Sequence, residues 1–338
     1  MTARLIQDQT NATNCMISTV TLDDIRTAQS RLQGVAARTH LIEFDHPESD
    51  TRRLFLKPEN QQPIGAFKLR GAYNKIASLA PEDRKRGVIS YSSGNHAQGV
   101  AYAARALGVK AINVMPDNAP TIKREATAAL GAEIVIVGPG SAERQTKAEE
   151  LAAQHGYVIV PPYNDEQIIA GQGTMGLEIL EDLPEVETVF APVGGGGMIS
   201  GVAAAIKLSR PSIKVIGVEP ELAGDAQASL RAGKIVHFKA EDVSRTIADG
   251  LRTQSIGAIN FEHIRRYVDD IVTVSEEEIR RAVRLLASNP ATVAEPSGAV
   301  AVAAFLFRSD QFSKARLNVA IISGGNIDPQ MLEEIRRE

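Results

Sequence analysis

Three loops of small residues each follow a run of apolar residues and lead into a helical pattern. They are Ser92–His96 (S-S-G-N-H), Gly194–Gly197 (G-G-G-G) and Ser323–Asn326 (S-G-G-N). In open parallel sheets, ligands bind beyond the carboxyl ends of the strands. Four successive glycines let backbone amides and the positive end of a helix dipole approach an anion with no side chain in the way. The tetraglycine therefore indicates a phosphate-binding loop, because a turn without a ligand would not explain the chain entropy that four glycines cost.

Other glycine patterns do not indicate a dinucleotide site. The G-x-G-x-x-G at Gly171–Gly176 lies inside a helical pattern, well past the preceding strand, and no acid stands about 20 residues further on. Gly138–Gly140 (G-P-G) follows a strand but lacks the third glycine. The P-loop, H-E-x-x-H and Cys/His zinc patterns are also missing from the sequence.

Lys68 is the candidate nucleophile. It stands in A-F-K-L-R-G, directly after Phe67 and two residues before Arg70. Taken alone, a lysine at a helix start is usually a solvated surface residue. Burial would lower its pKa, and Arg70 is expected to add to that effect. A lysine that is neutral near pH 7 can attack an aldehyde and form a Schiff base.

Short apolar runs alternate with amphipathic stretches along most of the chain. The expected strands are 54–57, 88–91, 111–115, 133–137, 157–160, 188–192, 214–218, 271–274 and 317–322. The expected helices include 96–107, 122–130, 142–155, 168–183 and 276–287. Another helix should begin at Thr21, because the acid Asp24 three residues on completes a capping box. Continuously apolar strands separated by helices indicate parallel sheets covered on both faces.

Two parallel-sheet α/β domains fit 338 residues better than one. Four strands with three helices between them predict a compact small domain at 85–162. It would be inserted in a larger domain formed by 1–84 and 163–338, in which residues 1–18 form a loose tail. The ligand would bind in the cleft between the two domains.

Composition excludes several classes of function. The net charge is −4 and no basic stripe with interleaved aromatic residues occurs, which argues against a nucleic-acid partner. Cys15 is the only cysteine, so an intrachain disulfide and a cysteine metal cluster are excluded. No apolar run is long enough for a signal peptide or a membrane span. These features predict a soluble cytoplasmic protein with no membrane partner.

The lysine segment, S-S-G-N-H-A-Q-G, the tetraglycine and S-G-G-N together resemble the fold-type II pyridoxal-phosphate family, in order and in spacing. Its members include threonine and serine dehydratases and serine racemase. The resemblance runs from about Thr21 to the C-terminus. It implies a fold similar to that of the tryptophan synthase β subunit, with pyridoxal 5'-phosphate as the cofactor. Family members are often dimers or tetramers, so a homo-oligomer is expected.

The resemblance also implies roles for individual residues. Lys68 matches the lysine that holds the cofactor and takes the Cα proton, and Phe67 would pack near the ring. Asn95 matches the residue that hydrogen-bonds the ring hydroxyl, and Ser323 matches the partner of the pyridine nitrogen. The implied phosphate loop is Gly194, Gly195, Gly196, Gly197 and Met198. The implied substrate-carboxylate loop is Ser92, Ser93, Gly94, Asn95 and His96.

A serine opposite the pyridine nitrogen favours β-elimination. Unlike a carboxylate, Ser323 cannot keep that nitrogen protonated, so the ring is a weaker electron sink and a full carbanion is poorly stabilised. Expulsion of a β-hydroxyl as the Cα proton leaves is then the easier course, and in this family the cofactor phosphate lies close enough to act as its acid. The products are a 2-oxo acid and ammonia. Two departures from the family pattern are His40, where a proline is usual, and Ala66, where a serine is common.

An acidic loop follows the strand at 214–218. Glu219, Asp225 and the carbonyl of Ala223 would supply only oxygen ligands, which suits Mg²⁺ or Ca²⁺. A solvated acidic loop is the alternative, and it is the common one. The pattern is similar to the divalent-cation loop of serine racemase and related dehydratases, and this favours a structural metal outside the active site.

Three residues bear on the choice of reaction and substrate. Ser93 matches the second base that a racemase needs, although many dehydratases share this serine. Tyr163 stands where serine racemase has a small amide, which favours a dehydratase. Arg144 begins a helix near the expected cleft and would pair with a second substrate carboxylate, as in 3-hydroxyaspartate. The alternative for Arg144 is a surface arginine.

The leading hypothesis is a threonine/serine ammonia-lyase that acts on a small β-hydroxy amino acid. Within enzymes, the alternatives are a 3-hydroxyaspartate dehydratase and a serine or other amino-acid racemase. A different class of function is a catalytically inactive homologue that binds pyridoxal phosphate without turnover.

Overall fold

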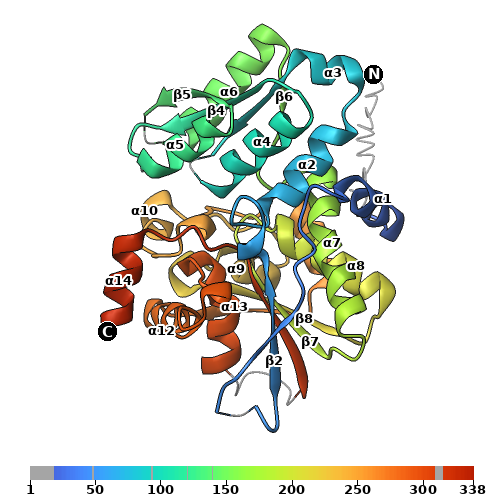
Figure 1. The fold of residues 1–338 in the computed structure, drawn as a ribbon, viewed down its shortest axis with the longest axis vertical. Coiled ribbons are helices and arrows are strands. Elements are labelled where there is room, and N and C mark those ends of the chain that lie inside the picture. Colours follow the sequence, from blue (N-terminus) through green and yellow to red (C-terminus); the bar gives the residue numbers. More distant parts are fainter. Residues whose placement is uncertain (1–18, 48, 93, 120, 139, 309–314) are drawn as a thin grey trace, which may run out of the picture.

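Two β-sheets organise the chain. The computed structural model describes residues 19–338 except 48, 93, 120, 139 and 309–314, so the expected tail at 1–18 lies outside the described residues. In the larger sheet six strands lie in the order β1-β2-β10-β7-β8-β9. In the smaller sheet four strands lie in the order β5-β4-β3-β6. Figure 1 shows the smaller sheet and its helices above the larger one.

Strand bounds match the expected apolar runs closely. The larger sheet contains β1 (Ile42–Phe44), β2 (Arg53–Pro58), β7 (Thr188–Pro192), β8 (Lys214–Pro220), β9 (Asp270–Val274) and β10 (Leu317–Ile322). The smaller sheet contains β3 (Val88–Tyr91), β4 (Ala111–Pro116), β5 (Glu133–Val137) and β6 (Val158–Ile159). The expected strands include no counterpart of β1, because its three residues alternate between half-buried and exposed and form no apolar run.

Strand direction confirms the expected α/β class with parallel sheets. All paired strands run parallel except β1 and β2, an antiparallel pair at the edge of the larger sheet. The four strands of the smaller sheet come between β2 and β7 in the chain, so the smaller unit is inserted in the larger one. The domain bounds 1–84 with 163–338, and 85–162, stay predictions.

Helices separate almost all the parallel strands. They are α1 (Leu22–Leu32), α2 (Lys68–Ser78), α3 (Pro81–Arg86), α4 (Asn95–Ala106), α5 (Thr121–Ala129), α6 (Ser141–His155), α7 (Glu166–Asp182), α8 (Gly197–Ser209), α9 (Asp225–Ala232), α10 (Ala240–Val243), α11 (Ala258–Tyr267), α12 (Glu276–Leu286), α13 (Pro296–Phe307) and α14 (Pro329–Arg337). Short 3₁₀ turns are η1 (Glu59–Gln61), η2 (Glu221–Ala223), η3 (Asp249–Leu251) and η4 (Pro290–Thr292). The capping box of Thr21 and Asp24 is present at α1, as expected. Within the described residues, no helix has the length and apolarity that crossing a membrane requires.

Both faces of the larger sheet are covered by helices. One apolar core takes residues from α1, α7, α8 and α11, and the other takes residues from α12, α13 and α14. The sheet between them is buried: all five residues of β7 are inaccessible to solvent or nearly so. This double burial explains why the strands read as continuous apolar runs.

The G-x-G-x-x-G pattern has a packing role inside α7. A Cβ on Gly171 would lie 2.7 Å from the carbonyl oxygen of Arg70 in α2. On the other side, a Cβ on Gly201 of α8 would lie 2.1 Å from the carbonyl oxygen of Ile169. Such distances leave room only for hydrogen, so α7 packs backbone to backbone between α2 and α8. Lys68 begins α2 and the tetraglycine leads into α8. This packing therefore sets the distance between Lys68 and the tetraglycine.

Candidate active site

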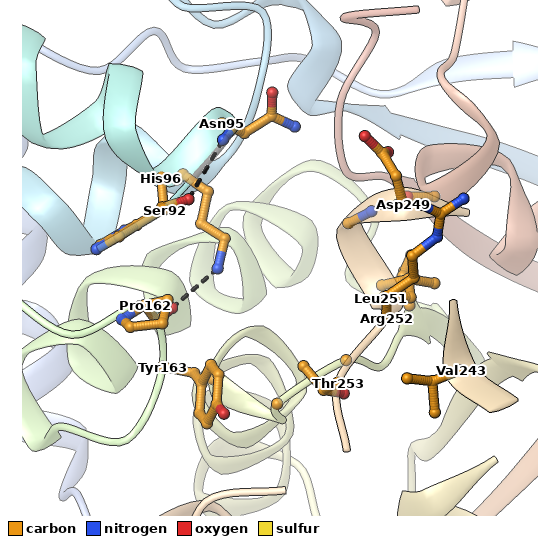
Figure 2. Close-up of a pocket in the computed structure, with 18 of the residues that line it drawn as sticks. Ser92, Asn95, His96, Pro162, Tyr163, Val243, Asp249, Leu251, Arg252 and Thr253 are labelled. Carbon is orange, nitrogen blue, oxygen red and sulfur yellow. Dashed lines mark hydrogen bonds between the residues drawn. The ribbon is translucent and has the colours of Figure 1, made fainter. Parts of the chain in front are cut away.

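A cavity of about 570 Å³ lies where strands of both sheets end. It is lined by loops after β3, β7 and β10 and by the start of α2. Figure 2 shows Ser92, Asn95 and His96 on one side of this cavity, with Asp249, Leu251 and Arg252 on the other. The expected site residues that line it are Phe67, Lys68, Ser92, Gly94, Asn95, His96, Arg144, Gly194, Gly195, Gly196, Gly197, Met198 and Ser323. Ser93 lies outside the described residues.

Lys68 is a half-buried lysine whose ammonium group contacts a neutral acceptor. Its Nζ donates a hydrogen bond to the carbonyl oxygen of Pro162 at 2.8 Å, and no carboxylate pairs with it in the described part of the chain. Burial lowers its pKa to about 8, because the protein around Nζ replaces water that would stabilise the charge. A substantial fraction of Lys68 is therefore neutral in mildly alkaline solution, as a nucleophilic amine must be.

Arg70 does not contribute to that shift, so this expectation is wrong. Its guanidinium is buried and neutralised by two carboxylates, with Nε 2.8 Å from Glu59 Oε2 and Nη1 2.7 Å from Glu178 Oε1. Lys57 Nζ also pairs with Glu178, at 2.5 Å. This network fixes the first turn of α2 against η1, β2 and α7. Sequence reasoning missed this network. One signal for it is Glu178, the single charged residue in the buried stretch 168–180 of α7.

The tetraglycine forms a narrow turn at the start of α8. Gly196 has a φ of +93°, a conformation that favours glycine. A Cβ on Gly195 would lie 2.3 Å from the ring of Tyr163, so that aromatic ring packs directly on the loop. The loop leads into a helix of 13 residues, whose first amides have no helical partners and carry partial positive charge. The residues present therefore fit a phosphate group.

Asn95 and Ser323 present neutral polar groups to the cavity. The Asn95 amide donates to Glu295 Oε1 at 2.6 Å, which leaves one N–H of the amide free of that bond. The Ser323 hydroxyl donates only a long hydrogen bond, 3.4 Å, to the carbonyl oxygen of Ser297. Both groups fit the hydrogen-bonding atoms of a substituted pyridine ring.

His96 offers no side-chain donor for a carboxylate. Burial and the nearby charge of Lys68 lower the pKa of its imidazole to about 3, so the ring is neutral. Its Nε2 lies 2.9 Å from the carbonyl oxygen of Val160, which requires the proton to be on Nε2 and leaves Nδ1 as an acceptor. An anion at this loop would instead meet the first backbone amides of α4, which no side chain caps.

Arg144 is a half-buried cation at the cavity wall. Its Nε has no hydrogen-bond partner within the described residues, and burial lowers the pKa of the guanidinium. By contrast, Lys123 at the same wall forms an ion pair with Asp249. Arg144 is thus a cation at the cavity wall whose Nε has no partner among the described residues.

The candidate metal ligands lie outside the set of residues that line the cavity. Glu219 is fully buried, and its carboxylate accepts from the amides of Ala226 at 3.0 Å and Gln227 at 2.8 Å. Burial and the adjacent Asp225 hold the pKa of Glu219 well above its usual range, and burial raises the pKa of Asp225 to about 7. In the described chain, neither carboxylate oxygen of Asp225 has a hydrogen bond of normal geometry, although nearby amides and the Thr253 hydroxyl offset part of that rise.

Two adjacent buried carboxylates, of which Asp225 has both oxygens without a hydrogen bond of normal geometry, fit a hard divalent cation. The 3₁₀ turn η2, which ends at Ala223, lies between them in the chain. Across the residues that the structure describes, no group of three or more His, Cys, Asp or Glu side chains forms a metal cluster. A cation here would therefore also need carbonyl or water ligands.

Known proteins resemble the chain over most of its length. The family model described as pyridoxal-phosphate dependent enzyme matches residues 32–324. An L-threonine ammonia-lyase of Thermotoga maritima is 47% identical over 94% of this chain and 78% of that protein. An L-threo-3-hydroxyaspartate ammonia-lyase of Saccharomyces cerevisiae is 42% identical over 82% of this chain and 83% of that protein.

Solved structures agree with these sequence relatives. A threonine deaminase from T.th. superimposes with a TM-score of 0.86 at 42% identity, covering 91% of this chain and 99% of that one. Maize serine racemase superimposes with a TM-score of 0.88 at 37% identity, covering 94% of this chain and 97% of that one.

Proposed function

The chain belongs to the family of pyridoxal-phosphate-dependent enzymes, and we propose that it is an ammonia-lyase that removes water and ammonia from threonine or serine to give a 2-oxo acid. The observation that carries the proposal is the half-buried Lys68, with its pKa lowered to about 8, in the same cavity as the tetraglycine loop. The similarity to an L-threonine ammonia-lyase over 94% of the chain supports the reaction type.

Different residues of the cavity would bind different groups of the cofactor. Lys68 would bind its aldehyde, and the amides of Gly194–Gly197 and Met198 would bind its phosphate with help from the α8 dipole. Phe67 would pack near the ring, Asn95 would donate to its hydroxyl, and Ser323 would face its nitrogen. When bound, pyridoxal phosphate withdraws electrons from the Cα of an attached amino acid, which makes the Cα proton acidic.

Residues of the chain would remove the Cα proton and bind the substrate carboxylate. Lys68 Nζ would take the Cα proton, for which a pKa near 8 is well suited. Ser92, Ser93, Gly94 and the first amides of α4, at Asn95 and His96, would bind the substrate carboxylate. The neutral hydroxyl of Ser323 favours elimination, because it cannot keep the ring nitrogen protonated and a long-lived carbanion is then unfavourable.

A 3-hydroxyaspartate ammonia-lyase is the second candidate. Arg144 supports it, since its guanidinium lies at the cavity wall with an unsatisfied Nε and suits a second substrate carboxylate. The yeast relative, 42% identical, is named for that substrate. Racemisation remains an alternative through Ser93 and the similarity to maize serine racemase.

A divalent cation, Mg²⁺ or Ca²⁺, would bind Glu219, Asp225 and the carbonyl of Ala223. The unsatisfied oxygens of Asp225 support this assignment. Its role would be structural, because none of the three residues lines the cavity. We also propose a cytoplasmic homo-oligomer with a small amino-acid substrate and no nucleic-acid or membrane partner.

The test is release of 2-oxo acid and ammonia by the purified, cofactor-loaded chain from L-threonine, L-serine and both L-3-hydroxyaspartates. Release from threonine or serine supports the proposal. Release from hydroxyaspartate alone transfers the assignment to the second candidate. Inversion of the recovered substrate without ammonia indicates a racemase, and bound cofactor with neither reaction indicates an inactive homologue.

A further inference from the structure

Glu295 is a buried carboxyl in the cavity wall for which the proposed function has no role. It precedes α13 as its N-cap residue, yet its side chain makes no capping hydrogen bond. Its Oε1 instead accepts from Asn95 Nδ2 at 2.6 Å, across 200 residues of sequence. The residue is 3% exposed. Because burying a carboxyl opposes folding, its contact with Asn95 calls for a functional reason.

A second amide holds Asn95 from the other side. Asn326 Nδ2 donates to Asn95 Oδ1 at 2.8 Å and to the Ile64 carbonyl oxygen at 2.9 Å. These contacts leave the Asn95 amide one orientation, because exchanging its oxygen and nitrogen would set acceptor against acceptor at Glu295 and donor against donor at Asn326. One N–H of Asn95 then remains for a ligand in the cavity.

Charged groups on two other elements face Glu295. Burial and the charge of Asp249 in η3 raise the pKa of its carboxyl, whereas Lys123 in α5 and the Asn95 hydrogen bond lower it, and the net pKa is about 7. Lys123 and Asp249 form an ion pair with each other. Glu295 therefore exchanges a proton near neutral pH. Its ionised form makes a charge-assisted and stronger hydrogen bond with Asn95 than its protonated form does.

We propose that Glu295 is a positioning residue that fixes the side-chain amide of Asn95 with one N–H directed at the ring hydroxyl of the cofactor. The inference rests on the proposed function through the assignment of Asn95. Hydrogen bonds at the ring tune the electronic properties of the cofactor. Its absorbance therefore reports the orientation of Asn95 independently of turnover.

The experiment titrates the cofactor-free chain with pyridoxal phosphate and records the dissociation constant and the absorbance spectrum between pH 6 and 8. Glu295→Ala should weaken binding about tenfold, the effect of one charge-assisted hydrogen bond, and shift the absorbance maximum. Glu295→Gln keeps an acceptor oxygen, so it should weaken binding by less than about threefold. It should also abolish the pH dependence of the spectrum that the wild type shows.

Glu277→Gln is the matched control, because Glu277 is an exposed carboxylate on α12 and should leave affinity and spectrum unchanged. Asn95→Ala distinguishes a failure of the proposed role of Asn95 from a failure of the positioning role of Glu295. If Asn95→Ala changes neither affinity nor spectrum, the assignment of Asn95 in the proposed function fails. If it changes both while Glu295→Ala matches the wild type, the positioning role alone is overturned. Should Glu295→Ala not fold, a Glu295→Gln spectrum with the wild-type pH dependence would overturn it instead.

Discussion

Lys68 donates its hydrogen bond to the carbonyl oxygen of Pro162, 94 residues further along the chain, at 2.8 Å. The next residue, Tyr163, packs its ring on Gly195 of the tetraglycine. One short segment thus contacts both the lysine and the loop to which we assign the cofactor phosphate. The contact holds the amine with a neutral acceptor, so burial is not offset by an anion and the pKa of Lys68 stays low.

The low pKa of Lys68 predicts how cofactor capture depends on pH. Only the neutral amine attacks an aldehyde, and with a pKa of about 8 the neutral fraction rises as pH rises through that value. The rate at which the cofactor-free chain gains bound-cofactor absorbance should rise about fivefold from pH 7 to pH 8 and level off above about pH 9. Lys68→Ala should show no covalent capture. A rate that still rises steeply to pH 10 would mean that the pKa of Lys68 is not lowered.

Glycine at position 195 should be essential for phosphate binding. In Gly195→Ala the new Cβ would lie 2.3 Å from the Tyr163 ring, so the loop or the ring must move. We expect pyridoxal-phosphate affinity to fall at least about tenfold, since the loss of one or two amide contacts to the phosphate is enough. Gly34→Ala is the control: its φ of +73° imposes backbone strain, but a Cβ there meets no atom within 4 Å. Equal affinities for the two variants would contradict the assignment of the tetraglycine as the phosphate-binding loop.

The ion pairs of Arg70 should matter more for stability than any surface pair. Arg70→Met leaves the carboxylate of Glu59 buried without its cation and weakens the pairing of Glu178. Removing one partner of a buried pair typically costs about 3–5 kcal/mol of unfolding free energy. Arg38→Ala removes a surface pairing with Glu181 and Asp182 and should cost less than about 1 kcal/mol. Urea unfolding followed by circular dichroism measures both, and similar losses would show that the buried network carries no special weight.

The loops of this site could be predicted from the sequence, whereas the burial and the long-range contacts of their side chains could not. The tetraglycine and Ser323 follow β7 and β10, neighbouring parallel strands of the larger sheet, so their convergence follows from local pattern. Ser92 follows β3 of the smaller sheet, so its approach to them depends on how the two sheets pack. The burial of Lys68 and the contact between Asn95 and Glu295 join segments far apart in the chain. No local periodicity encodes them. His96 shows the same limit, because its contact with Val160, which leaves the ring without a donor for a carboxylate, depends on the fold.

A divalent cation should stabilise the chain through Glu219 and Asp225. Two adjacent buried carboxylates repel each other and lack solvation, and a cation relieves both costs. Millimolar Mg²⁺ or Ca²⁺ should therefore raise the melting temperature of the EDTA-treated wild type by several degrees, as ligand binding to the native state does. Asp225→Asn should abolish the response. Glu221→Gln should keep it, because Glu221 in the same loop pairs with Arg308 instead. An unchanged melting temperature in the wild type would refute the site.

Arg144 should decide between substrates with one and two carboxylates. Its guanidinium lies at the cavity wall, half-buried, with an Nε that has no partner among the described residues. Arg144→Gln should lower kcat/KM for 3-hydroxyaspartate about 100-fold more than for threonine, because only the former places a second carboxylate against the lost cation. Arg105→Gln, an exposed arginine at the end of α4, should leave that ratio unchanged. Equal losses on both substrates would assign Arg144 to the architecture of the cleft instead. That result would leave threonine or serine as the substrate that the cavity fits.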